Sequence, residues 1–118
     1  MVKKKTENEL ITALSKAGIP KNAAKCLSHI VQVGETKSVK IERATGLRQP
    51  EVSIAMQYLR KRGWIKKKDI KKKGKGRPVH SYMLAMSKSK LANVVAKDEQ
   101  EKIKKIQDNI KTIKVLLK

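Results

Sequence analysis

The last quarter of the chain constrains the fold most. Residues 88–118 contain neither proline nor glycine, so nothing in this run interrupts a helix. At 1.5 Å per residue, such a helix is about 46 Å long. The whole chain has 118 residues, which is enough for one ordinary domain, and a helix of this length extends beyond so small a body. We therefore expect residues 86–118 to form a coiled-coil-like helix appended to the domain.

This helix carries an apolar seam along one side. Five large aliphatic residues follow one another at alternating spacings of three and four, which is the a/d pattern of a coiled coil. An exposed seam of this kind would be an open apolar patch, and pairing with a second copy of the chain would cover it. The seam predicts a homodimer, and its dimerisation residues are Ile103, Ile106, Ile110, Ile113 and Leu117. The alternative is a monomer in which the helix folds back onto the first two helices.

Turn signals divide the rest of the chain. We expect a basic tail over residues 1–5, a helix that begins with a Thr6–Glu9 capping box, and helices that end at Gly18, Gly34, Gly46 and Gly63. Ser38 and Gln49 are the expected caps of the third and fourth helices. After Gly63 the repeat of the hydrophobic pattern is no longer that of a helix. Residues 64–70 and 78–84 are predicted to form two strands on either side of a Gly- and Lys-rich loop. The fold class is mainly α with a small β-hairpin wing.

The fourth predicted helix, residues 49–62, has one buried and one polar side. Val52, Ala55, Met56 and Leu59 form a single apolar stripe, so Gln49, Ser53, Ile54, Gln57 and Arg60 face away from it or flank it. A short helix that leads through a Gly-containing turn into such a helix is a helix-turn-helix arrangement, whose second helix enters the major groove of DNA. Glutamine bonds adenine edges and serine reaches bases or phosphates. The predicted base-reading residues are Gln49, Ser53 and Gln57.

Residues 46–65, GLRQPEVSIAMQYLRKRGWI, resemble the recognition-helix signature of prokaryotic winged helix-turn-helix regulators of the ArsR, MarR and TrmB types. Residues 41–47 match the preceding short helix, and residues 75–84 are similar to the Gly-Arg-Pro…Tyr wing of many archaeal members. The resemblance covers about residues 20–84 and implies a winged helix-turn-helix DNA-binding domain over residues 6–85. The Cys and His clusters of ArsR-type metal sensors are missing. Only one helix follows the wing, so no small-molecule ligand is evident.

The charge of the chain points to a polyanion. The formal net charge is +20, and so large an excess opposes compaction unless a polyanionic partner neutralises it. Residues 60–77 contain eleven Lys or Arg and one Asp, beside the predicted reading helix. Solubility, a hot environment or a solvated hairpin tip would be the alternative reasons for these charges. The predicted DNA-backbone contacts are Arg48, Arg60, Lys61, Lys71, Lys72, Lys73, Lys75 and Arg77.

Other chemistry has little support in the sequence. Cys26 is the only cysteine and is expected to be a small core residue, while His29 and His80 are expected at the surface or its boundary. We expect no catalytic residue, metal or cofactor, because no paired carboxylates, nucleophile–base set or phosphate-binding glycine loop is present. No apolar run is as long as the core of a signal peptide or a membrane span. The expected location is therefore the cytoplasm, in association with the nucleoid.

These features together predict a sequence-selective regulator of transcription that binds double-stranded DNA as a homodimer. Two alternatives belong to other classes. One is a chromatin protein that coats DNA with no preferred sequence, which the charge and the absence of a sensor domain favour. The other is a docking module whose basic surface meets RNA or an acidic protein.

Overall fold

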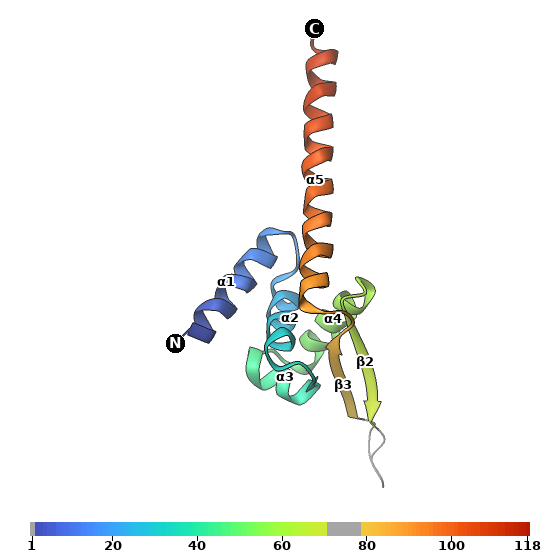
Figure 1. Ribbon diagram of the computed structural model, residues 1–118. Helices are drawn as coiled ribbons and strands as arrows, with labels where there is room; N and C mark the ends of the chain where they lie inside the picture. Colours follow the sequence, from blue (N-terminus) through green and yellow to red (C-terminus); the bar gives the residue numbers. More distant parts are fainter. Residues whose placement is uncertain (1, 71–78) are drawn as a thin grey trace. The chain divides into compact units, whose positions relative to one another are not determined.

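The structure is a computed structural model that describes the backbone of residues 2–70 and 79–118 and the side chains of residues 7–68 and 80–118. Five helices and three strands occur in the described part of the chain (Figure 1). The chain divides into two units, one ending at Met86 and one beginning at Ser87. The predicted fold class, mainly α with a small β-hairpin wing, is confirmed. The elements are α1 (Val2–Lys16), α2 (Lys21–Val33), β1 (Thr36–Lys37), α3 (Ser38–Thr45), α4 (Gln49–Lys61), β2 (Ile65–Ile70), β3 (Val79–Leu84) and α5 (Lys88–Leu116).

The sheet has one strand more than the sequence predicted. β2 and β3 form the expected antiparallel hairpin, in register from Ile65 opposite Leu84 to Ile70 opposite Val79. The additional strand, β1, pairs with the other side of β3, so the order is β1-β3-β2. Ser81 on β3 helps to hold β1 in place, because its buried Oγ donates a hydrogen bond at 2.8 Å to Oε1 of Glu35, the residue before β1. A strand of two residues has no alternating pattern, and its pairing with β3 is set by tertiary structure alone.

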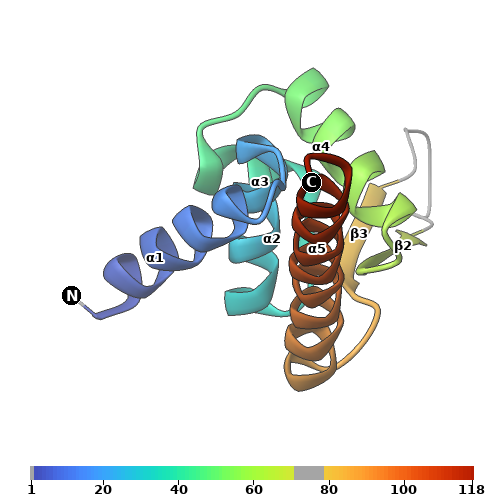
Figure 2. The same cartoon turned by 90° about the horizontal axis from the view of Figure 1, so that it is seen from above.

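The core of the first unit lies where α2, α3 and α4 meet the sheet. α2 packs against both α1 and α4 (Figure 2), and the apolar stripe of α4 is buried as predicted. Trp64, only 1% exposed, and Tyr82 are the buried aromatic residues. The aliphatic side chains buried around them include Leu27, Ile30, Ile41, Val52, Met56 and Leu59.

Cys26 belongs to this core. Its side chain is fully buried, and burial raises the pKa of the thiol to about 11, although the nearby Lys25 acts in the opposite direction. The thiol is therefore protonated at neutral pH, and the reactive thiolate form is suppressed. This agrees with the interpretation of Cys26 as a small core residue.

Three of the predicted helix starts are wrong. α3 is capped by Lys37 and begins at Ser38, the residue expected as its cap. α1 begins at Val2 and not at Thr6, so residues 2–5, expected as a basic tail, are helical; three of them are lysines, which are good helix formers. α4 is capped by Arg48 and not by Gln49, because Glu51 Oε1 accepts a hydrogen bond from the backbone N–H of Arg48 at 3.2 Å. Gln49 is thus the first helical residue of α4, and Pro50 follows it.

The second unit is α5. The Ser87 side chain accepts a hydrogen bond from the backbone N–H of Lys90 at 3.2 Å, which fixes the start of this helix. The helix then continues to Leu116 without interruption, as the lack of proline and glycine predicted. None of the helices in the described ranges is long and apolar enough to cross a membrane.

Candidate nucleic-acid interface

The turn between α3 and α4 sets the direction of the candidate reading helix. Gly46 adopts a left-handed conformation with φ of 73°, which side-chain-bearing residues rarely adopt. Its N–H donates to the Glu42 carbonyl at 2.9 Å. Thr45 Oγ1 donates to the Ile41 carbonyl at 2.6 Å and accepts from the Leu47 N–H at 3.3 Å. These bonds close the end of α3 and hold the turn, so α4 leaves it in a defined direction (Figure 1).

α4 turns a polar face away from the core. Its stripe of Val52, Ala55, Met56 and Leu59 is buried. The three residues predicted to read bases, Gln49, Ser53 and Gln57, are all exposed. Because successive residues are rotated by about 100° around a helix, Gln57 lies on the side opposite the stripe, and Gln49 and Ser53 lie toward one edge of the outward face. A polar face of this kind is free to enter a groove of DNA.

A basic hollow lies between this face and the wing. It is lined by Gln57, Arg60, Lys61, Ile65, Lys66 and Lys67, three from α4 and three from β2. Figure 1 shows α4 beside β2, and the two elements pack against each other. Four cations and a glutamine thus line one concave surface, where positive charge attracts and concentrates a polyanion.

The hollow adds two residues to those predicted as backbone contacts. Arg60 and Lys61 were predicted, whereas Lys66 and Lys67 were not, although both belong to the basic run over residues 60–77. Their place beside Gln57 follows from the packing of β2 on α4, which the run itself does not reveal. Lysines on β2 also occupy the free edge of the sheet, where charge opposes edge-to-edge aggregation.

The other predicted backbone contacts divide into two groups. The Arg48 side chain is exposed at the start of α4, so it is accessible to a partner. Lys71, Lys72, Lys73, Lys75 and Arg77, the predicted contacts at the tip of the wing, lie outside the described residues and remain predictions.

Arg62 links α4 to the wing. Its guanidinium lies 4.8 Å from the centre of the Trp64 ring and 6.0 Å from that of Tyr58, within the range of cation–π attraction. Between these residues Gly63 takes a positive φ of 76°, and the Trp64 N–H donates back to the Leu59 carbonyl at 3.2 Å. The junction therefore fixes the direction in which β2 leaves α4, and with it the shape of the basic hollow.

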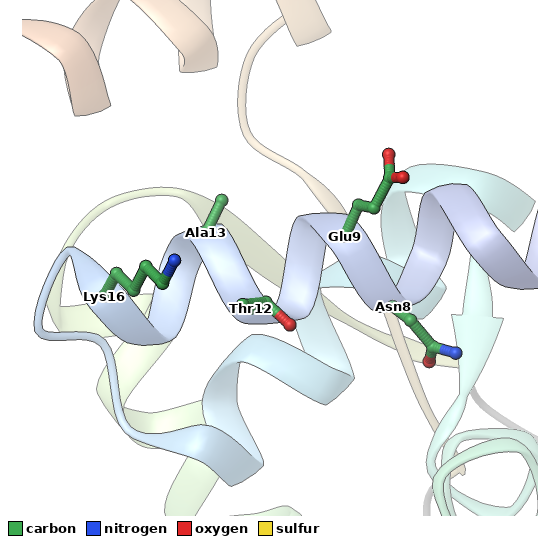
Figure 3. Close-up of a pocket in the computed structure, with 5 residues that line it drawn as sticks. All are labelled: Asn8, Glu9, Thr12, Ala13 and Lys16. Atoms are coloured by element: carbon green, nitrogen blue, oxygen red, sulfur yellow. The ribbon is translucent and has the colours of Figure 1, made fainter.

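Other surface features offer less chemistry. Figure 3 shows a hollow lined by Asn8, Glu9, Thr12, Ala13 and Lys16. All five residues belong to α1, so the hollow is a depression along one helix. Among the described side chains, those of residues 7–68 and 80–118, no group of three or more His, Cys, Asp or Glu could hold a metal ion.

The geometry of the first unit defines a winged helix: a helix-turn-helix made by α3 and α4, followed by a β-hairpin wing. No protein-family model matches the chain, and no curated protein sequence matches it. Several solved structures are similar to it in fold, among them the following three.

The first similar structure is TrmBL2, an archaeal chromatin protein that shows a novel mode of DNA binding. It has a TM-score of 0.69 and 16% identity over 94% of this chain, which spans 40% of the TrmBL2 chain. The second is a possible transcriptional regulator from Methanosarcina mazei Go1, with a TM-score of 0.68 and 14% identity over 80% of this chain and 79% of that one. The third is NadR in complex with 4-hydroxyphenylacetate, with a TM-score of 0.55 and 18% identity over 96% and 81% of the two chains.

At these identities the similarity is one of fold. The predicted winged helix-turn-helix architecture is confirmed.

Proposed function

We propose that the chain is a sequence-selective regulator of transcription that binds double-stranded DNA as a homodimer. Residues 49–62 would lie in the major groove, and the basic wing, residues 64–84, would hold the backbone or enter the minor groove. The observation that carries this proposal is the continuity of the exposed polar face of α4 with the basic hollow. A surface that only kept the protein soluble would not need glutamine and serine on one helix beside cations on the next strand.

The residues in this surface have separate roles. Gln49, Ser53 and Gln57 would contact base edges, where a glutamine can bond adenine through two hydrogen bonds. The cations would bind phosphates, which sets the register of the protein on the duplex but does not discriminate between sequences. They are Arg48, Arg60, Lys61, Lys66 and Lys67, together with the predicted contacts at the wing tip.

A homodimer through α5 would place two reading helices on one duplex. In the single chain the five seam residues are between 46% and 81% exposed, and a second copy would cover them. Two subunits related by a two-fold axis should prefer an inverted repeat with half-sites about 10 base pairs apart, or a multiple of that spacing. If each subunit neutralises three to five phosphates, log affinity should fall against log salt with a slope of roughly −5 to −9.

The test is a selection from genomic DNA fragments at about 150 mM salt, followed by sequencing of the bound fragments. We expect one shared inverted repeat. Gln57→Ala should then relax the preference at one base position, at a cost of about 1–3 kcal/mol. Lys66→Ala is the matched control, because loss of a phosphate contact should weaken binding to all sequences alike. A Gln57→Ala protein that keeps the same base preferences would contradict the assigned role of α4.

A non-sequence-specific architectural protein is the second candidate. The net charge of +20 favours it, and so does similarity in fold to TrmBL2, which is a chromatin protein. In that case the selection would recover genomic DNA uniformly, with the same steep salt dependence but no shared sequence. Recovery of no DNA at all would instead favour a protein-docking role. With either DNA-binding function, we infer that the protein acts in the cytoplasm, on the nucleoid.

A further inference from the structure

The outward face of α4 is not wholly polar. Ile54 is 68% exposed and, like Gln57, lies on the side of α4 opposite the buried stripe. Isoleucine is an unfavourable choice for this position if only a soluble helix is needed, because it is β-branched and offers water nothing but apolar surface. Its exposed side chain is available to a partner with apolar surface of its own.

Ile54 is part of a continuous apolar surface. A second hollow, separate from the basic one, lies between the start of α2 and α4, and its apolar lining consists of Pro20, Ala23, Ile54, Ala55 and Tyr58. Lys21, Asn22 and Glu51 complete the lining. A single exposed aliphatic side chain is common on protein surfaces, but here Ile54 forms the exposed end of a larger apolar depression.

The two hollows place Ile54 within the candidate reading surface. Gln57, three residues further along α4, lines the basic hollow, whereas Ile54 lines the apolar one. The outward face of one helix therefore offers a hydrogen-bonding side chain and an apolar side chain next to each other, with cations on the side of the wing. Duplex DNA offers a matching surface. The major groove presents polar base edges for the hydrogen-bonding side chain, one kind of apolar group for the apolar side chain, and phosphates along both sides for the cations. That apolar group is the C5-methyl of thymine.

We propose that Ile54 is a specificity-determining residue that recognises thymine through its C5-methyl group in the major groove. The inference rests on the proposed function, since it requires the outward face of α4 to enter that groove. It assigns to this face a preference that the polar residues alone do not supply. Gln57 selects by hydrogen bonds, and Ile54 selects a T·A pair by burying a methyl group that no other base carries.

The test removes only the methyl group. Each thymine of the sequence obtained by selection is replaced in turn by deoxyuridine, which keeps Watson–Crick pairing and the O4 acceptor. At the thymine that contacts Ile54, we expect the wild-type protein to bind about fourfold more weakly, which corresponds to losing the burial of one methyl group. Ile54→Ala should bind the thymine and deoxyuridine sites equally well. Circular dichroism and thermal melting should show that this exposed substitution leaves the fold intact.

Val33→Ala is the matched control. Val33 is also an exposed aliphatic residue, 52% exposed at the end of α2, and it lines neither hollow. This variant should keep the full sensitivity to deoxyuridine.

The outcomes separate this inference from the proposed function. A selected sequence in which no thymine methyl matters, or matters equally to wild type and Ile54→Ala, overturns the role of Ile54 and leaves the regulator intact. DNA binding with no enriched sequence overturns both the role of Ile54 and sequence selectivity. If Ile54→Ala keeps wild-type affinity and deoxyuridine sensitivity, the role of Ile54 in DNA binding is overturned.

Discussion

α4 and α5 carry the same kind of apolar pattern, and the structure treats the two patterns differently. In each helix, large apolar residues recur at spacings of three and four. The stripe of α4 is buried among α2, α3 and β2, whereas the seam of α5 is exposed in the single chain. The pattern of a helix therefore predicts that one side will be covered, but it does not say whether the cover comes from the same chain. In α4 the covering elements lie within the chain, and we infer that in α5 the cover is a second copy.

The largest expected effect tests the stripe of α4. Leu59 is fully buried, so Leu59→Ala should lower the free energy of unfolding of the first unit by about 2–5 kcal/mol. Ile110→Ala removes apolar bulk from the exposed seam and should change the stability of the first unit by less than about 0.5 kcal/mol. Fluorescence of Trp64, the single tryptophan of the chain, reports on unfolding of the first unit in urea. The measurements should be made at one protein concentration, because association adds to apparent stability.

Equal losses of free energy of unfolding in Leu59→Ala and Ile110→Ala would contradict the contrast between the buried stripe and the exposed seam. The seam would then be as important to the stability of the first unit as its own core. Such a result would favour the monomer in which α5 folds back onto the first helices.

The next effect tests the seam. Ile106→Asp combined with Ile110→Asp places two carboxylates where the second copy should pack, and burial of unpaired charge is strongly unfavourable. We expect the wild-type protein to have about twice the chain mass of 13.3 kDa by light scattering, and the double variant to have the mass of one chain. The salt slope of DNA binding should fall to about half, because one subunit releases about half of the counterions.

Val115→Asp is the control for this experiment. Val115 is 69% exposed on the same helix, but about 100° of rotation per residue places it on the side opposite the seam. It should therefore keep the mass of the wild type. A wild-type protein with the mass of one chain would contradict dimerisation, whatever the variants do.

The parts of the structure that the sequence predicted are those fixed by local chemistry. Gly46 marked the end of α3, and Pro50 and Gly63 marked the limits of α4 to within two residues, because turns and caps depend on nearby backbone. β1 could not be predicted, because the two residues Thr36 and Lys37 have no strand pattern and depend on β3 for pairing. The start of α1 was missed because Thr6, a residue type favoured at caps, lies inside the helix behind three lysines that are good helix formers.

The candidate site shows the same division. That Gln57 is exposed followed from the period of α4. The sequence did not show that Gln57 shares a hollow with Lys66 and Lys67, because this depends on the packing of β2 on α4. Ile54 was recognisable as an outward residue from the sequence. Its apolar neighbours Pro20, the N-cap of α2, and Ala23 on α2 lie more than thirty residues away along the chain. The apolar surface around Ile54 therefore could not be predicted from α4 alone.

The smallest expected effect is a pH dependence confined to the first unit. His29, on α2, is partly buried, and its Nε2 lies 3.3 Å from Thr36 Oγ1 on β1. Burial lowers the pKa of His29 below its usual 6.5, while Glu7 acts in the opposite direction. Protonation is thus less favourable in the folded chain than in the unfolded one, where the pKa is about 6.5. The contribution to stability is complete above that value and is lost as the pH falls through 6.5 toward the lowered pKa of the folded state.

Urea unfolding followed by Trp64 fluorescence should therefore show a free energy of unfolding that decreases between pH 7.5 and pH 5.5. His29→Gln, which keeps a side-chain amide for Thr36, should remove most of this decrease, whereas His80→Gln, which leaves His29 in place, should retain it. α5 has no histidine, so the self-association measured by light scattering should not change over the same range. An unchanged pH dependence in His29→Gln would show that the titrating group lies elsewhere. A dimer that dissociates as the pH falls would show that the pH dependence is not confined to the first unit.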